Sequence, residues 1–268
     1  MVGDKRCAVM NDLEFYCDRF MLFVLLLLIS QGAQADVVNA IKRVKPSVVG
    51  IGTLLRTRTP PAQLTGTGFI VSDGQHAITN YHVVSRKLNQ QRNERYAIFV
   101  GKGQNANVST ATIVGVDKEH DLALLKFVGK KRPAVKLGSD TLVSEGRLCA
   151  FTGFPIGAAL GLYPVTHRGI ISAVTPIATQ VGNSKQLTAA LISRLRETFN
   201  VYQLDATAYP GNSGSPLYEA DTGKVIGVVN SVFIKESKET VIQKPSGISY
   251  AIPVKYVRQL LADLNLQP

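Results

Sequence analysis

Tyr209-Pro210-Gly211-Asn212-Ser213-Gly214-Ser215-Pro216-Leu217 decides the fold, because it places one serine between two glycines with apolar segments on both sides. Glycine accepts backbone angles that other residues resist, so Gly-Asn-Ser-Gly predicts a tight turn. Such a turn aims consecutive N–H groups at one point. That point suits the negative oxygen of an acyl-transfer intermediate, with the Ser213 hydroxyl close enough to attack. A plain turn between two strands is the competing interpretation.

Nucleophilic catalysis at Ser213 requires a base, and the chain has four histidines. His82 lies in Ala77-Ile78-Thr79-Asn80-Tyr81-His82-Val83-Val84, at the end of an expected strand. Asp121 leads the apolar run Leu-Ala-Leu-Leu. An aspartate at the mouth of a buried strand can accept the imidazole N–H and stabilise the imidazolium that forms when the serine loses its proton. The chain order histidine, aspartate, serine is that of chymotrypsin.

The spacing of apolar residues and glycines indicates an all-β chain, a barrel or sandwich, and about 230 residues suit two barrels better than one. Helical spacing is expected in three places: near the N-terminus at Asp36–Val44, in an insertion at Leu187–Phe199, and at the C-terminus from Val254 to Leu264. We expect strands near Ser47–Gly52, Gly66–Val71, Ala97–Val100, Ala111–Val116, Leu122–Phe127, Leu148–Thr152, Val165–Ala173, Val201–Asp205, Val225–Phe233 and Ser249–Ile252.

The segments around His82, Asp121 and Ser213 together resemble those of the HtrA/Deg serine proteases, a bacterial branch of the trypsin-like fold. Supporting segments that resemble the family are Gly66-Thr67-Gly68-Phe69-Ile70-Val71, Gly153-Phe154-Pro155-Ile156-Gly157, Gly169-Ile170-Ile171-Ser172-Ala173 and Gly247-Ile248-Ser249-Tyr250-Ala251-Ile252-Pro253. The resemblance runs from about Val37 to Val257 and implies two six-stranded β-barrels with the site between them. It departs from the family at Ser215, where a second glycine is usual, and no PDZ domain is expected to follow.

The resemblance implies a role for each site residue. Ser213 is expected to be the nucleophile and His82 the general base and then general acid, with Asp121 orienting the imidazole. The backbone N–H groups of Gly211 and Ser213 are expected to form the oxyanion hole. The first barrel would supply the histidine and the aspartate, and the second barrel the serine.

The run Val225–Phe233 is expected to edge the substrate cleft and to pair with an extended peptide. Its expected substrate-binding residues are Val228, Val229, Asn230 and Ser231, and the valines there favour an apolar pocket for small or aliphatic side chains. An alternative uses Asp205 as a pocket acid that selects Lys or Arg.

The N-terminus indicates export. Phe20–Ile29 is purely apolar but shorter than the roughly 20 residues that span a bilayer, and an Ala-x-Ala ending follows it. We therefore expect a signal peptide at 1–35, a first barrel at 36–140 and a second barrel with the C-terminal helix at 141–268. The mature chain is expected to be periplasmic or secreted, with no stable membrane span.

Composition limits the other functions. The net charge is +11, but the positive residues are scattered, and neither a nucleic-acid module nor a Cys/His cluster with metal spacing is present. Cys149 alone would remain after cleavage, as a buried apolar residue. We expect no cofactor, no metal and no nucleic-acid partner. A homotrimer is compatible with the resemblance, because Val37–Val44 takes the place of the family's assembly region.

The sequence thus predicts an exported serine endopeptidase that acts on unfolded or extended polypeptides. The alternative is a chaperone-like binding module on the same fold that cuts slowly or not at all, because a triad without a formed oxyanion hole is not sufficient. A small-ester esterase ranks last, since the chain lacks the Gly-x-Ser-x-Gly elbow and the alternating helices of α/β-hydrolases.

Overall fold

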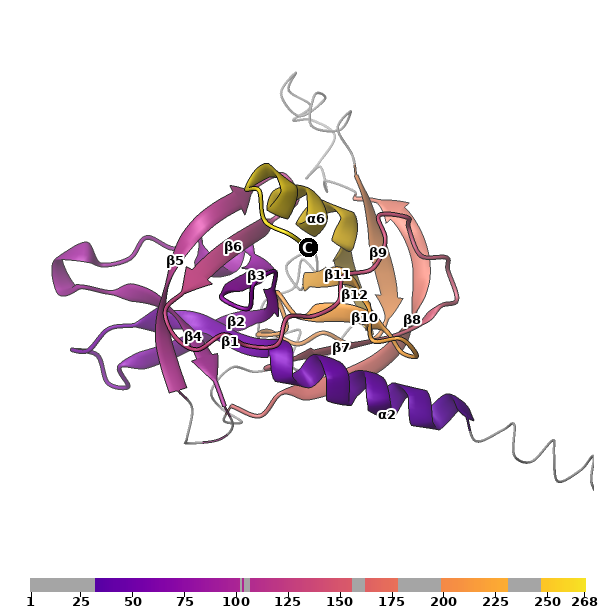
Figure 1. Ribbon diagram of the computed structural model, residues 1–268, viewed down its shortest axis with the longest axis horizontal. Coiled ribbons are helices and arrows are strands. Elements are labelled where there is room, and N and C mark those ends of the chain that lie inside the picture. Colours follow the sequence, from indigo (N-terminus) through magenta and orange to yellow (C-terminus); the bar gives the residue numbers. More distant parts are fainter. Residues whose placement is uncertain (1–31, 102, 104–106, 156–161, 178–198, 231–246) are drawn as a thin grey trace, which may run out of the picture.

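The structure is a computed structural model that describes residues 32–101, 103, 107–155, 162–177, 199–230 and 247–268. Over these residues the chain forms twelve strands, which close into two separate six-stranded antiparallel barrels (Figure 1). The expected all-β class with two barrels is confirmed.

The first barrel has the strand order β1-β2-β3-β6-β5-β4. Its strands are β1 (Val48–Leu54), β2 (Ala62–Val71), β3 (His76–Asn80), β4 (Arg95–Val100), β5 (Asn107–Asp117) and β6 (Leu122–Phe127). Apolar side chains such as Ile51, Ile70, Ile98 and Leu125 fill its interior. Because β-branched and large apolar residues suit a pleated, buried surface, these runs form strands.

The second barrel has the order β10-β11-β12-β9-β8-β7. Its strands are β7 (Leu148–Gly153), β8 (Val165–Pro176), β9 (Asn200–Asp205), β10 (Pro216–Glu219), β11 (Val225–Asn230) and β12 (Ile248–Pro253). Phe151, Ile171, Leu204 and Val229 are among the side chains that fill it. Residue 140, where we expected the domain boundary, lies between the last strand of the first barrel and the first strand of the second.

The ten strands expected by range occur near where they were expected, and the strand expected before His82 is β3. Among the described strands, β10 was missed. It has four residues and begins with Pro216, so it is too short to show a clear alternation of apolar and polar residues. The expected strand Val225–Phe233 is seen as far as Asn230, and its last three residues lie outside the described residues.

Helices and short helical turns lie against the two barrels. α2 (Gly32–Val44) begins four residues earlier than expected, and its Arg43 guanidinium donates to the carbonyls of Asp221 and Thr222 in the second barrel. α6 (Val254–Asp263) lies where the C-terminal helix was expected and packs against both barrels (Figure 1). The short helical turns are η1 (Lys45–Ser47), α3 (Tyr81–Val84) and η2 (Gln90–Arg92). Of the expected helix Leu187–Phe199, all but Phe199 lies outside the described residues.

A third apolar cluster joins the barrels. It contains Phe69 and Leu124 from the first barrel, Tyr218 and Val228 from the second, and Val257 from α6, all fully buried. This shared core fixes one barrel against the other and so fixes the relative position of the catalytic candidates that each one carries. No helix among the described residues has the length and apolarity needed to cross a membrane.

Candidate active site

His82 lies in α3, the single helical turn that follows β3. The turn is anchored by Asp121, which immediately precedes β6, the neighbouring strand of the barrel. The backbone N–H of Tyr81 and the side-chain amide of Asn80 both donate to the Asp121 carbonyl, at 2.9 and 3.1 Å. Asp121 has a φ of +49°, a left-handed conformation that aspartate tolerates better than most residues.

The Asp121 side chain holds His82 by two contacts. Carboxylate Oδ1 accepts the His82 backbone N–H at 2.8 Å, and Oδ2 lies 2.6 Å from ring atom Nδ1. The imidazole therefore presents its other nitrogen, Nε2, for proton exchange, as a general base requires. Both side chains are only partly buried, with 29% of His82 and 21% of Asp121 exposed.

Asn230, at the end of β11, completes the support of the carboxylate. Its side-chain amide donates to Asp121 Oδ2 at 2.7 Å. Because Asn230 belongs to the second barrel and Asp121 to the first, this hydrogen bond joins the two barrels at the site. Asn230 was expected to contact substrate, and the structure places it on the aspartate of the expected triad.

Ser213 lies in a tight turn between β9 and β10. The N–H of Asn212 donates to the Tyr209 carbonyl and the N–H of Ser215 donates to the Asn212 carbonyl, both at 2.9 Å. Gly211 and Gly214 have φ angles of +100° and +89°, which glycine adopts without strain. The expected Gly-Asn-Ser-Gly turn is present, and Ser213 is 4% exposed.

Thr67 of β2, in the first barrel, forms hydrogen bonds to the serine turn. Its N–H donates to the Ser213 carbonyl at 2.9 Å, and its hydroxyl donates to the Gly211 carbonyl at 2.7 Å while accepting the Phe154 N–H at 3.0 Å. One residue of the first barrel therefore holds two carbonyls of the turn, those of Gly211 and Ser213.

Gly66 shows how close the two halves of the site come. A Cβ atom built at this glycine would lie 2.8 Å from Cγ1 of Val83, the residue after His82, and 3.1 Å from the carbonyl oxygen of Ser213. Both distances are shorter than ordinary van der Waals contact, so any side chain here would push the histidine turn and the serine turn apart.

The expected oxyanion donors lie in the serine turn. The N–H of Gly211 donates to no atom of the described residues. Removal of one such donor typically costs about 2.7–4 kcal/mol of transition-state stabilisation. The assignment of Gly211 and Ser213 as oxyanion donors stays a prediction.

The expected specificity residues are placed differently from one another. Val228 and Val229 are fully buried, and their strand is already paired with β10 on one side and β12 on the other. Ser231 lies outside the described residues. Asp205, the alternative pocket acid, is an exposed residue at the end of β9. The apolar pocket and the pairing of this run with a peptide stay predictions.

The other titratable candidates have local structural roles. The Nδ1 atom of His76 lies 2.7 Å from a carboxylate oxygen of Asp73, and that of His120 lies 2.6 Å from a carboxylate oxygen of Asp117. Burial lowers the pKa of His167. Burial raises the pKa of the Cys149 thiol to about 12, so this cysteine is not a thiolate nucleophile. Within the described ranges, no group of three or more His, Cys, Asp or Glu side chains is arranged to hold a metal ion.

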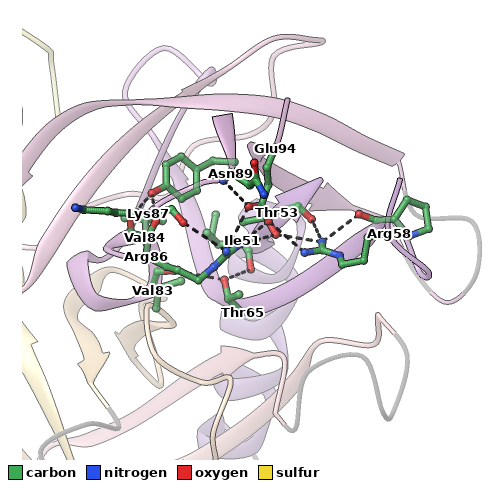
Figure 2. Close-up of polar contacts among 12 residues, drawn as sticks. Ile51, Thr53, Arg58, Thr65, Val83, Val84, Arg86, Lys87, Asn89 and Glu94 are labelled. Carbon is green, nitrogen blue, oxygen red and sulfur yellow. Dashed lines mark hydrogen bonds and ion pairs between the residues drawn. The ribbon is translucent and has the colours of Figure 1, made fainter. Parts of the chain in front are cut away.

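A polar cluster behind α3, which the sequence did not reveal, fixes the chain that follows His82 (Figure 2). The Tyr96 hydroxyl donates to the carbonyls of Val84 and Arg86, and the Arg86 guanidinium donates to the Glu94 carboxylate. Glu94 also accepts from Arg58 at 3.2 Å. Arg86 lowers the pKa of this buried carboxylate to about 2, so it stays charged at neutral pH.

Comparisons with known proteins show which family the chain is similar to. The family described as trypsin-like peptidase domain matches residues 66–228. The human protein named Serine protease HTRA3 is 29% identical over 235 residues, which is 85% of this chain and 45% of the human protein. A Pseudomonas putida protein named Probable periplasmic serine endoprotease DegP-like is 31% identical over 74% of this chain and 34% of its own length. The chain thus spans less than half of these relatives.

Solved structures are similar as well. The HtrA-type protease AlgW with a tripeptide superimposes with a TM-score of 0.60 at 27% identity, covering 86% of this chain and 64% of that one. Deg5 gives a TM-score of 0.60 at 25% identity, covering 84% of this chain and 92% of that one.

Proposed function

The chain belongs to the family of trypsin-like peptidase domains, and from that premise we propose that it is a serine endopeptidase that cleaves extended or unfolded polypeptides through an acyl-enzyme. The observation that carries the proposal is the bidentate contact of Asp121 with His82, at 2.6 and 2.8 Å, beside the turn that presents Ser213. Relatives named as serine proteases support it.

In the proposed mechanism, Ser213 Oγ attacks the scissile carbonyl carbon while His82 Nε2 takes its proton. Asp121 accepts a hydrogen bond from the Nδ1–H of His82, which orients the ring and stabilises the imidazolium without transfer of that proton. The negative carbonyl oxygen would be held by the N–H groups of Gly211 and Ser213. His82 then gives its proton to the leaving amine. In the second half of the reaction His82 takes a proton from water, the water oxygen attacks the acyl carbon, and His82 returns the proton to Ser213 Oγ as the ester bond breaks.

The proposal extends to location. An apolar stretch followed by Ala-x-Ala, and the similarity to a protein named as periplasmic, support export with cleavage after Ala35. Cleavage there would remove the first four residues of α2. Terminal sequencing of the exported protein should begin at Asp36, and recovery of residues 1–35 on the exported protein would contradict it. Sedimentation analysis of the same sample would test a homotrimer.

The activity is tested by a fluorophosphonate probe, which labels a serine only when a base has activated it. We expect labelling of the wild-type protein and of a Ser139→Ala control, and none of Ser213→Ala or His82→Ala. The same variants should lose cleavage of casein-like unfolded substrates. If the wild-type protein binds these substrates but is neither labelled nor able to cut them, it is a binding module instead.

A further inference from the structure

A cavity of about 450 Å³ opens on the first barrel, between the β1–β2 turn and the start of β4. Three of its seven lining residues are arginines: Arg56, Arg92 and Arg95. The rest are Leu54, Thr57, Asn93 and Thr110, so hydroxyl and amide groups surround the three cations and only one side chain is apolar. We call this cavity the arginine pocket.

No carboxylate lines the arginine pocket, and none of its three arginines forms an ion pair within the part of the chain that the structure describes. The nearest acid along the chain, Glu94, is buried and does not line the pocket. Its carboxylate accepts from both Arg58 and Arg86 (Figure 2). The positive charge of the pocket is therefore not cancelled by the protein itself.

The walls of the pocket are built by the fold. Arg95 lies on β4 opposite Leu54 of β1, and Thr110 lies on β5. Arg92 is in η2, where its N–H is capped by the Asn89 side chain at 3.1 Å, and its guanidinium donates to the Thr57 hydroxyl at 2.9 Å.

The turn that carries Arg56 and Thr57 is held as well. The Leu55 N–H donates to the Pro61 carbonyl at 2.8 Å, and the Arg58 guanidinium donates to the carbonyls of Thr53 and Pro61 at 3.1 Å each. The pairing of β1 with β4, the hydrogen bond from Asn89 in η2 and the hydrogen bonds within the β1–β2 turn thus hold the backbone that carries the three arginines around one concave space.

This arrangement selects a particular ligand chemistry. A guanidinium presents a planar fork of donors that matches two oxygens of a tetrahedral anion. A single carboxylate has two oxygens and one charge and would occupy one fork, whereas linked phosphate groups offer oxygens and charge to three. We propose that the arginine pocket binds a ligand that carries several phosphate groups. This site is separate from the proposed catalytic site and does not depend on it.

The test is calorimetric titration of the whole protein with inorganic tripolyphosphate at fixed ionic strength. We expect saturable binding of one tripolyphosphate per chain. The double variant Arg56→Gln with Arg95→Gln should weaken it by about tenfold or more, because hydrogen bonds to charged groups are worth about 1.5–3 kcal/mol. Arg168→Gln with Lys130→Gln removes the same charge from exposed positions elsewhere and should change the affinity less than twofold.

Two further ligands sharpen the result. Citrate, a tricarboxylate, should bind at least tenfold more weakly than tripolyphosphate. If ATP binds with the same arginine dependence, the natural ligand is a nucleotide. If tripolyphosphate binds and ATP does not, the natural ligand is a free polyphosphate chain. Equal loss in the control variant, absence of saturable binding, or equal binding of citrate would overturn the proposal. If the double variant does not fold, tripolyphosphate affinity is measured for the single Arg56→Gln and Arg95→Gln variants, and each should bind more weakly than the wild-type protein.

Discussion

Asn230 donates its side-chain N–H to Oδ2 of Asp121 at 2.7 Å, the same oxygen that lies 2.6 Å from the His82 ring. The carboxylate is therefore fixed from both sides, by the histidine of its own barrel and by an amide from the other barrel. A carboxylate held this way cannot rotate away from the imidazole without losing a charge-assisted hydrogen bond.

Asn230→Ala should lower kcat/KM by about 10- to 100-fold, the equivalent of losing a hydrogen bond to a charged group. The loss should fall mainly on kcat, because the imidazole is less well oriented in the transition state. Asn230→Ser retains a donor and should recover part of the activity. A change confined to KM, with kcat unaltered, would instead assign Asn230 to substrate binding, as the sequence first suggested.

Gly214→Ala should abolish labelling of Ser213 and destabilise the fold. A methyl group at Gly214 would overlap the Thr67 carbonyl oxygen and lie 2.5 Å from the Thr79 hydroxyl, at a φ of +89°. Backbone strain and a backbone clash together should cost more than about 3 kcal/mol of unfolding free energy.

Gly146→Ala is the matched control for this prediction. Gly146 has a similar φ of +81°, and nothing lies within 4 Å of the position its Cβ would take. It should therefore show only the strain of a left-handed backbone, about 1–2 kcal/mol, and keep its activity. Equal melting temperatures for the two variants would show that the contact with Thr67 does not constrain the serine turn.

Local sequence explains why the structural setting of the candidate residues was predictable, although their catalytic roles stay predictions. Ser213 was expected in a glycine-flanked turn, Asp121 at the start of a buried strand and His82 at the end of a strand, and the structure has these settings. Leu122–Phe127 was expected with the bounds that the structure gives, because a short, mostly apolar run is typical of a buried strand.

The missed features depend on pairing between distant segments. Asn230 contacts Asp121 across 109 positions, and nothing around it in the sequence shows that the two meet. Glu94 lies in a polar stretch that looks like solvated surface, yet its side chain is 2% exposed because arginines from two other segments converge on it. β10 is a strand because it pairs with β7 and β11, and its four residues alone do not predict a strand.

Ser215→Ala should stabilise the protein. The Ser215 hydroxyl is fully buried behind the serine turn and has no partner among the described residues, at the position where the resemblance leads us to expect glycine. An unpaired buried polar group is costly, so its removal should gain up to about 1 kcal/mol, or roughly 2–4 °C in melting temperature.

Ser249→Ala provides the contrast, since the Ser249 hydroxyl is equally buried but donates to the Ala206 carbonyl at 2.6 Å and accepts from the Ala208 N–H at 2.7 Å. That variant should lose about 1–3 kcal/mol. A destabilised Ser215→Ala would mean that its hydroxyl is satisfied in solution, for example by a buried water molecule.

Glu94 should make the stability of the first barrel depend on acid. The hydrogen bond from Arg86 holds its pKa at about 2, below the usual 4.5. Because the folded-state pKa is depressed, the carboxylate stabilises the fold fully above pH 4.5, and this contribution declines as the pH falls toward 2. It amounts to about 3 kcal/mol, of which about 2 kcal/mol is lost by pH 3.

Glu94→Gln should therefore lower the unfolding free energy clearly at pH 7, with a difference from wild type that narrows by more than half at pH 3. Glu119→Gln, at an exposed position, should show no such convergence in denaturant titrations at the two pH values. Parallel pH curves for wild type and Glu94→Gln would contradict a charged Glu94 as the anchor of the segment behind His82.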